Sequence, residues 1–92
     1  MIGMLKSWLE RRRAVRRRWQ VDARRLVRED ERGAYYQAQR LAARARAEGS
    51  GGEFANWAKV AAEVARISPR AEMDFATVQA IVDAELRREG RP

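Results

Sequence analysis

Arginines are the residues of this sequence whose number and spacing indicate a chemical role, and that role is the binding of anions. Nine of the twenty residues from 9 to 28 are arginines, namely Arg11, Arg12, Arg13, Arg16, Arg17, Arg18, Arg24, Arg25 and Arg28. Guanidinium groups offer planar pairs of donors that match phosphate and carboxylate oxygens. Residues 1–28 hold ten basic and two acidic side chains (net +8), whereas residues 29–92 hold ten basic and eleven acidic ones (net −1), which together give +7. The clustering predicts an anionic partner for the first segment.

Other chemistries lack the residues they need. The chain contains no histidine and no cysteine, so the usual general bases, thiol nucleophiles and soft metal ligands are missing. The glycine-containing segment 49–52 has neither the lysine nor the preceding strand of a phosphate-binding loop. We therefore expect no catalytic residue, no metal site and no cofactor, and a protein that is not an enzyme.

Helical periodicity places the arginines on a long amphipathic helix over residues 1–28. At about 100° per residue its apolar side chains share one side, and most arginines line the two rims of that side. Arg12 and Arg16 instead fall within the apolar stripe. If these two pair with acids elsewhere in the chain, the helix is structural, and if they remain unpaired it is a binding surface.

Residues 30–90 are predicted to form a compact three-helix unit, which makes the protein all-α and a single domain overall. Asp30 is the expected N-cap of a helix that ends near Glu48, followed by a left-handed cap at Gly49. Ser50 and Glu53 have the spacing of a capping box, and so short a connection predicts an antiparallel helical hairpin. The first helix of this hairpin is expected to bury a mostly alanine face made of Ala34, Tyr35, Ala38, Leu41, Ala42 and Ala45.

The two later helices also show apolar faces at helical spacing. Ser68-Pro69 is expected to end the third helix of the chain and Asp74 to cap the fourth. The core face predicted for the third helix consists of Phe54, Trp57, Ala58, Ala61, Val64 and Ala65. The exposed face of this helix is expected to hold Asn56, Lys59 and Glu63. Such a face lacks the basic residues that a DNA-reading helix presents. The buried face predicted for the fourth helix consists of Phe75, Val78, Val82 and Leu86, with Ile81 beside it.

The residue pattern of the basic helix is compatible with several kinds of partner. Arginines interleaved with tryptophans are typical of binding to nucleic-acid phosphates with little sequence specificity, which is the leading hypothesis. The alternative is docking on an acidic protein, with Trp8, Trp19 and Leu26 as apolar anchors, or on an anionic membrane surface. A solvated face is also open, with its arginines partly paired as Arg18–Asp22 and Arg25–Glu29. Trp19 and Leu26 are further expected to contact the hairpin, and a projecting apolar N-terminal end would favour a homodimer.

Composition also bears on location. No apolar run reaches the roughly 18 residues of a membrane span, and the charges of the N-terminal segment follow its apolar patch, opposite to a secretory signal. We therefore expect a cytoplasmic protein. Arginine outnumbers lysine 18 to 2, a ratio typical of GC-rich bacterial genomes, although such bias does not explain the clustering.

Overall fold

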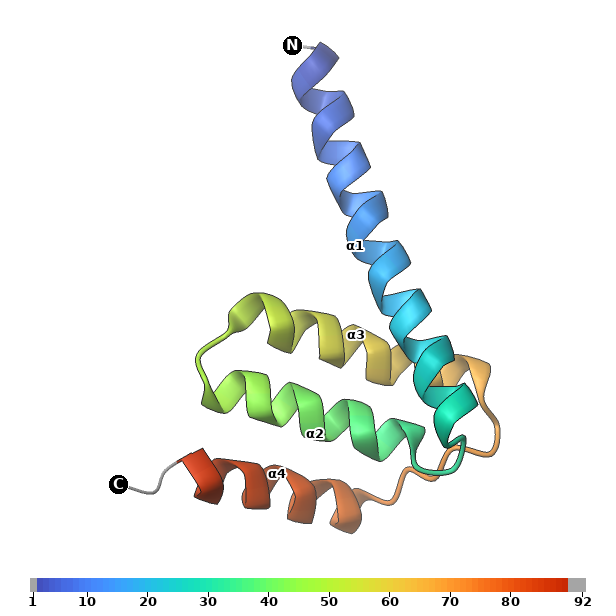
Figure 1. The fold of residues 1–92 in the computed structure, drawn as a ribbon, viewed down its shortest axis with the longest axis vertical. Helices are drawn as coiled ribbons and strands as arrows, with labels where there is room; N and C mark the ends of the chain where they lie inside the picture. Colours follow the sequence, from blue (N-terminus) through green and yellow to red (C-terminus); the bar gives the residue numbers. More distant parts are fainter. Residues whose placement is uncertain (1, 90–92) are drawn as a thin grey trace.

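The computed structural model describes residues 2–89, and within them it contains four helices and no strand (Figure 1). The helices are α1 (Ile2–Glu29), α2 (Ala34–Ala47), α3 (Gly51–Ile67) and α4 (Phe75–Glu89). The all-α prediction is confirmed. Residues 1 and 90, where the two predicted segments begin and end, lie outside the described residues. None of the four helices, over the part described, is both long and apolar enough to cross a membrane.

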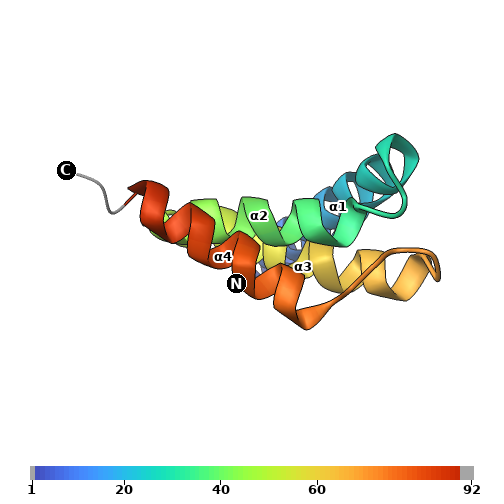
Figure 2. The same ribbon diagram turned by 90° about the horizontal axis from the view of Figure 1, so that it is seen from below.

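The helices are arranged around α2, which lies between two neighbours. It packs against α3 on one side, in the predicted antiparallel hairpin, and against α4 on the other (Figure 1). Within the described residues α4 contacts neither α3 nor α1. The second half of α1 crosses α3 and also contacts α2. In Figure 2 the C-terminal end of α1 lies above α3. The three helices after α1 therefore lie side by side in the order α3, α2, α4.

Small side chains make the contact between α2 and its neighbours. The prediction of an alanine face on α2 is confirmed, because its buried residues are Ala34, Ala38, Ala42, Ala43 and Ala45. Ala34 and Ala38 share one core with Val60, Ala61 and Val64 of α3 and with Ala23 and Leu26 of α1. Alanine has no bulk beyond its Cβ, so neighbouring helices can approach closely.

The predicted core face of α3 is only partly right. Ala61 and Val64 are buried and Trp57 packs against the core, but Phe54, Ala58 and Ala65 are exposed. The buried stripe is turned toward Asn56, Val60 and Glu63 because α1 crosses that side of α3. The expectation that Asn56 and Glu63 are exposed is therefore wrong, whereas Lys59 is exposed as expected.

The predicted buried face of α4 also needs correction. Val78, Ile81 and Val82 are partly buried, but Phe75 is 79% exposed and Leu86 is 43% exposed. Since α4 packs on α2 alone, only a narrow stripe of it is covered. That stripe includes a carboxylate, because Glu85 is buried against α2.

The buried carboxylate of Glu85 has a cationic partner on α2. Arg44 donates from Nη2 to Oε1 over 3.1 Å and from Nε to Oε2 over 3.4 Å. These hydrogen bonds hold the pKa of Glu85 below its ordinary value, against the opposing effect of burial. A charge-assisted pair therefore joins α2 to α4 near the C-terminal ends of the two helices.

Two of the predicted helix caps are present. Gly49 adopts a φ of +76°, and the backbone N–H groups of Gly49 and Ser50 donate to the carbonyls of Arg46 and Ala45. This is the bonding of a helix end closed by a left-handed residue. At the start of α4, Asp74 Oδ2 accepts from both the backbone N–H and the hydroxyl of Thr77, and these bonds lower the pKa of Asp74.

The other two predicted caps are wrong. Asp30 accepts from the Gly33 N–H over 3.2 Å and closes a turn, and α2 begins only at Ala34. Ser50 occupies the N-cap position of α3 but makes no side-chain cap bond. The capping box does not form because Glu53 binds Arg18 of α1 instead.

Candidate nucleic-acid interface

The first half of α1 projects away from the rest of the protein (Figure 1). Every residue from 3 to 18 is exposed, and we call this segment the arm and the described remainder, residues 19–89, the body. Sixteen helical residues extend about 24 Å. A lone helix of this length is only marginally stable in water, but the arm continues a helix that is already packed. Its alanine, leucine and arginine residues favour helix as well.

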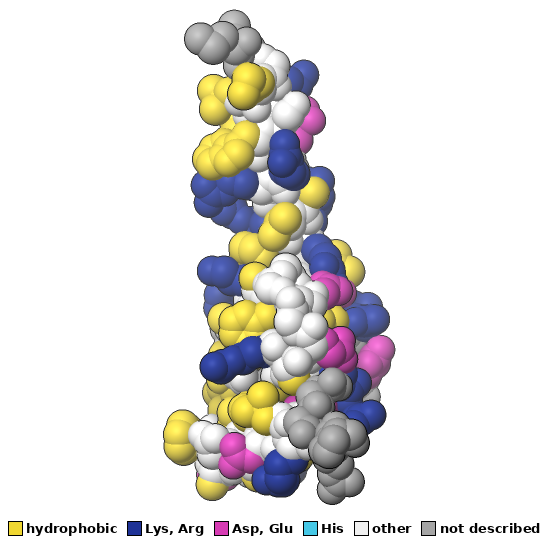
Figure 3. All heavy atoms as spheres, turned by 90° about the vertical axis from the view of Figure 1, so that its left-hand side faces the viewer, with side chains coloured by type: hydrophobic (Ala, Val, Ile, Leu, Met, Phe, Trp, Pro, Cys, Tyr) yellow, Lys and Arg dark blue, Asp and Glu magenta, His cyan; other side chains and the backbone are white. Residues whose placement is uncertain are grey.

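Positive charge dominates the arm. It carries seven basic side chains and one acidic one, a net charge of +6. Figure 3 shows hydrophobic side chains gathered near its free end and basic side chains along the stretch that leads to the body. Leu5, Trp8 and Leu9 are 59%, 49% and 39% exposed.

All nine predicted arginines are exposed on α1, but two of them have carboxylate partners. Arg18 lies 3.6 Å from Asp22, as predicted, and also 2.7 Å from Glu53. Arg25 lies 3.7 Å from Asp22 rather than pairing with Glu29 as expected. Among the described residues no carboxylate lies within 4 Å of the remaining seven, which are Arg11, Arg12, Arg13, Arg16, Arg17, Arg24 and Arg28.

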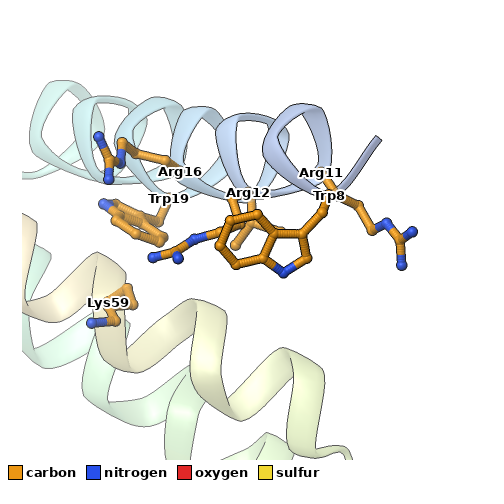
Figure 4. A pocket seen from close by; sticks show the side chains of 7 residues that line it. Trp8, Arg11, Arg12, Arg16, Trp19 and Lys59 are labelled. Atoms are coloured by element: carbon orange, nitrogen blue, oxygen red, sulfur yellow. The ribbon is translucent and has the colours of Figure 1, made fainter. Parts of the chain in front are cut away.

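The side of the arm that faces α3 forms one wall of a cleft of about 430 Å³ (Figure 4). It is lined from α1 by Trp8, Arg11, Arg12, Val15, Arg16 and Trp19, and from α3 by Lys59. The lining contains four cations and no carboxylate. Arg12 and Arg16 can occupy the apolar stripe because α1 diverges from α3 there and no core closes over them.

Both tryptophans of the cleft are in contact with a cation. The guanidinium carbon of Arg12 lies 4.9 Å from the ring centroid of Trp8, and Nζ of Lys59 lies 5.6 Å from that of Trp19. Figure 4 shows Arg12 between the two indole rings, with Lys59 rising from α3 below Trp19. Such cation–π contacts hold flexible cationic side chains in place without neutralising their charge.

Comparison of the chain with models of known protein families, with curated proteins and with solved structures finds no match. Cations without carboxylate partners, beside one half-exposed and one partly buried indole ring, suit a ligand that is both anionic and flat. No three His, Cys, Asp or Glu side chains of residues 2–89 are grouped so that they could hold a metal ion.

A polar network at the base of the cleft joins α1 to α3. Arg18 donates to Oε1 of Glu53 over 3.0 Å, and Nδ2 of Asn56 donates to Asp22 over 3.1 Å. Asn56 is only 5% exposed, so its bond to Asp22 is shielded from water. The network therefore fixes the direction in which α1 leaves the body.

The three predicted apolar anchors have different environments. Trp8 is half exposed, and Trp19 is partly buried against the core. Leu26 is 5% exposed within the core, which confirms the expected contact with the hairpin but leaves it unable to anchor a partner. Lys59 was missed as a site residue because it is forty positions from Trp19, and only the crossing of α1 and α3 brings the two together.

Proposed function

We propose that this is a non-catalytic protein whose arm binds nucleic-acid phosphates with little sequence specificity. The observation that carries the proposal is the set of cations on the arm that have no carboxylate partner among the described residues, on two rims and inside the cleft. In the body, by contrast, the buried carboxylates Glu63 and Glu85 each have an arginine partner. Since unpaired like charges repel, such an arrangement is best explained by an anionic ligand.

The shape of the site favours nucleic acid over a membrane surface. The cleft has walls on two helices, and a flat bilayer could contact only one of them. A helix lying on a membrane would also immerse Arg12 and Arg16, which share the apolar stripe with Trp8. A nucleic-acid chain is narrow enough to enter between the helices and carries phosphates along its whole length.

We expect low sequence specificity because contacts to phosphates carry no sequence information. Asparagine and glutamine, which read adenine, are absent from residues 3–18, although arginine can also bind the edge of guanine. We further propose that the protein acts in the cytoplasm, where such polymers are abundant.

The test is fluorescence anisotropy with a labelled oligonucleotide at several salt concentrations. If about six phosphates are contacted, log K should fall with log[salt] with a slope of about −5, a loss of about 10³-fold between 50 and 200 mM. Replacing Arg13, Arg16 and Arg17 by glutamine should make this slope shallower by about 3. No binding at 50 mM salt would contradict the proposal.

The matched control removes the same charge from the body. Arg46, Arg70 and Arg87 are exposed and lie outside α1 and α3. Replacing all three by glutamine should weaken oligonucleotide binding only by lowering the net charge of the protein. The slope of log K against log[salt] should stay nearly unchanged. An equal effect of the two triple variants would show that the arm has no special role.

A second candidate is docking on an acidic protein, which the exposed Leu5, Trp8 and Leu9 favour. Replacing Leu5 and Leu9 by glutamine separates the two functions, because phosphate binding should persist and docking on a protein groove should be lost. Sedimentation with neutral and anionic vesicles tests the membrane alternative. Light scattering of the same variant shows whether these residues instead pair two copies of the chain.

A further inference from the structure

One row of side chains along α1 places two arginines between two tryptophans at the cleft. Trp8, Arg12, Arg16 and Trp19 follow one another at steps of four, four and three residues, which places them on one face of the helix. The row extends about 16 Å from the first tryptophan to the last. Lys59 faces the end of this row from α3.

Phosphate binding alone does not account for Trp8. It is 49% exposed and its ring contacts Arg12, and it is not part of the core of the body. Paired bases in a duplex keep their faces inside the stack and show mainly phosphates and groove edges to a protein. Unpaired bases show their faces, and these stack on indole rings and guanidinium planes.

We infer that the cleft between the arm and α3 binds a single strand of nucleic acid, with a base stacked at Trp8 and Arg12 and phosphates at Arg16 and Lys59. The inference rests on the proposed function and names the form of nucleic acid that the site takes. The charge of the lining complements that of a nucleic-acid strand, since the lining holds four cations and no carboxylate. Arg12, held over Trp8, presents a second flat surface for a base, and Lys59 supplies a point charge that suits a phosphate oxygen.

The experiment compares a 12-nucleotide single strand with a duplex of the same length at 100 mM salt. Anisotropy of the labelled strand should give an affinity about tenfold or more above that of the duplex, and tryptophan fluorescence should be quenched only by the single strand. Trp8→Ala should weaken single-strand binding about tenfold, the effect of losing one base stack, and leave duplex binding unchanged. Trp8→Phe should restore part of the loss, because a smaller ring still stacks.

Matched controls separate stacking from damage to the fold. Phe75→Ala removes an aromatic ring that is 79% exposed on α4, and it should change neither affinity. Trp8 lies outside the core, so Trp8→Ala should keep the circular dichroism spectrum and melting temperature of the wild-type protein. Lys59→Gln should weaken single-strand binding several-fold and duplex binding less.

Each remaining outcome has a defined meaning. Equal affinity for both forms, with no effect of Trp8→Ala, would overturn the inference and leave the proposed function standing. Absence of binding to either form at 50 mM salt would overturn both. A mononucleotide that binds as tightly as the 12-mer would overturn the strand as occupant and make the cleft a nucleotide pocket.

Discussion

The buried carboxylates of the body are paired with arginines, whereas most cations of the arm have no carboxylate partner among the described residues. In the body, Arg66 donates to both oxygens of Glu63 over 2.8 and 2.6 Å, and Arg44 does the same for Glu85. The hydrogen bonds from Arg66, with a smaller contribution from Arg24, hold the pKa of Glu63 below its ordinary value. The arm instead accumulates cations, and only Arg18 at its base has a carboxylate partner among the described residues.

The difference shows which part of the charge pattern serves folding. Pairing with arginine lets α3 bury Glu63 and α4 bury Glu85 beside a small core of alanine and valine. The arm stacks like charges at i and i+4, as at Arg12 and Arg16, and each such pair disfavours the helix by about 0.2–0.5 kcal/mol. Its charge therefore opposes folding slightly and is expected to be offset when an anion binds.

The largest expected difference between the regions concerns packing. Ala38 is fully buried in the seam between α2 and α3, so Ala38→Leu should overpack it and lower the free energy of unfolding by about 2–3 kcal/mol. Ala14→Leu makes the same change on the exposed arm and should alter stability by less than about 0.5 kcal/mol. Urea denaturation measures both. Equal effects would show that the arm packs on the body.

A smaller effect is expected from acid. Because the pKa of Glu85 is lowered in the folded protein, its contribution to stability is complete above its unfolded value near 4.5. That contribution is lost as the pH falls below 4.5 and through the lowered value. Glu85→Gln should cost about 1 kcal/mol at pH 7, since Arg44 is 38% exposed and partly screened. It should cost less at pH 3.

The arm supplies the control for this pH experiment. Glu10 is exposed on the arm and has no ion-pair partner among residues 2–89. Glu10→Gln should therefore change the free energy of unfolding at pH 7 by less than about 0.5 kcal/mol. A loss of stability as large as that of Glu85→Gln would mean that the contrast in charge pairing does not determine stability.

The smallest expected effect is on the arm's own helicity. Replacing Arg13 and Arg17 by glutamine removes a like-charge pair at i and i+4 and should stabilise the arm helix by a few tenths of a kcal/mol. Amide hydrogen exchange of residues 5–14 should slow accordingly, and added salt should slow it in the wild-type protein. Faster exchange in the variant would indicate that these arginines stabilise the arm.

Local signals in the sequence predicted much of the fold. The alanine periodicity of α2, the left-handed Gly49 and the Asp74 cap each depend on a few neighbouring residues, and the structure confirms them. The buried faces of α3 and α4 could not be predicted in the same way. The buried face of α3 depends on where α1 crosses it, and that of α4 depends on its packing against α2. Both are relations between segments that are distant in the sequence.

The residues of the candidate site also fall into those that one helix determines and those that depend on contacts between distant segments. The nine arginines and Trp8 could be found from the sequence because they lie on one helix. Lys59 could not, and neither could the binding of Glu53 to Arg18 in place of a helix cap. The sequence singles out Arg12 and Arg16 because they interrupt the apolar stripe. Only the arrangement of α1 against α3 shows that no carboxylate of the described residues pairs with them.

The most direct measurement of the central claim is a map of the amide signals that shift when nucleic acid binds. ¹⁵N-labelled protein would be titrated with the 12-nucleotide strand at 100 mM salt and followed by two-dimensional NMR. The account predicts that shifts concentrate in residues 3–18 and around Lys59, and that α4 stays unchanged. Shifts centred on α4 or on the turn at 30–33, or no shifts at saturating strand, would contradict it.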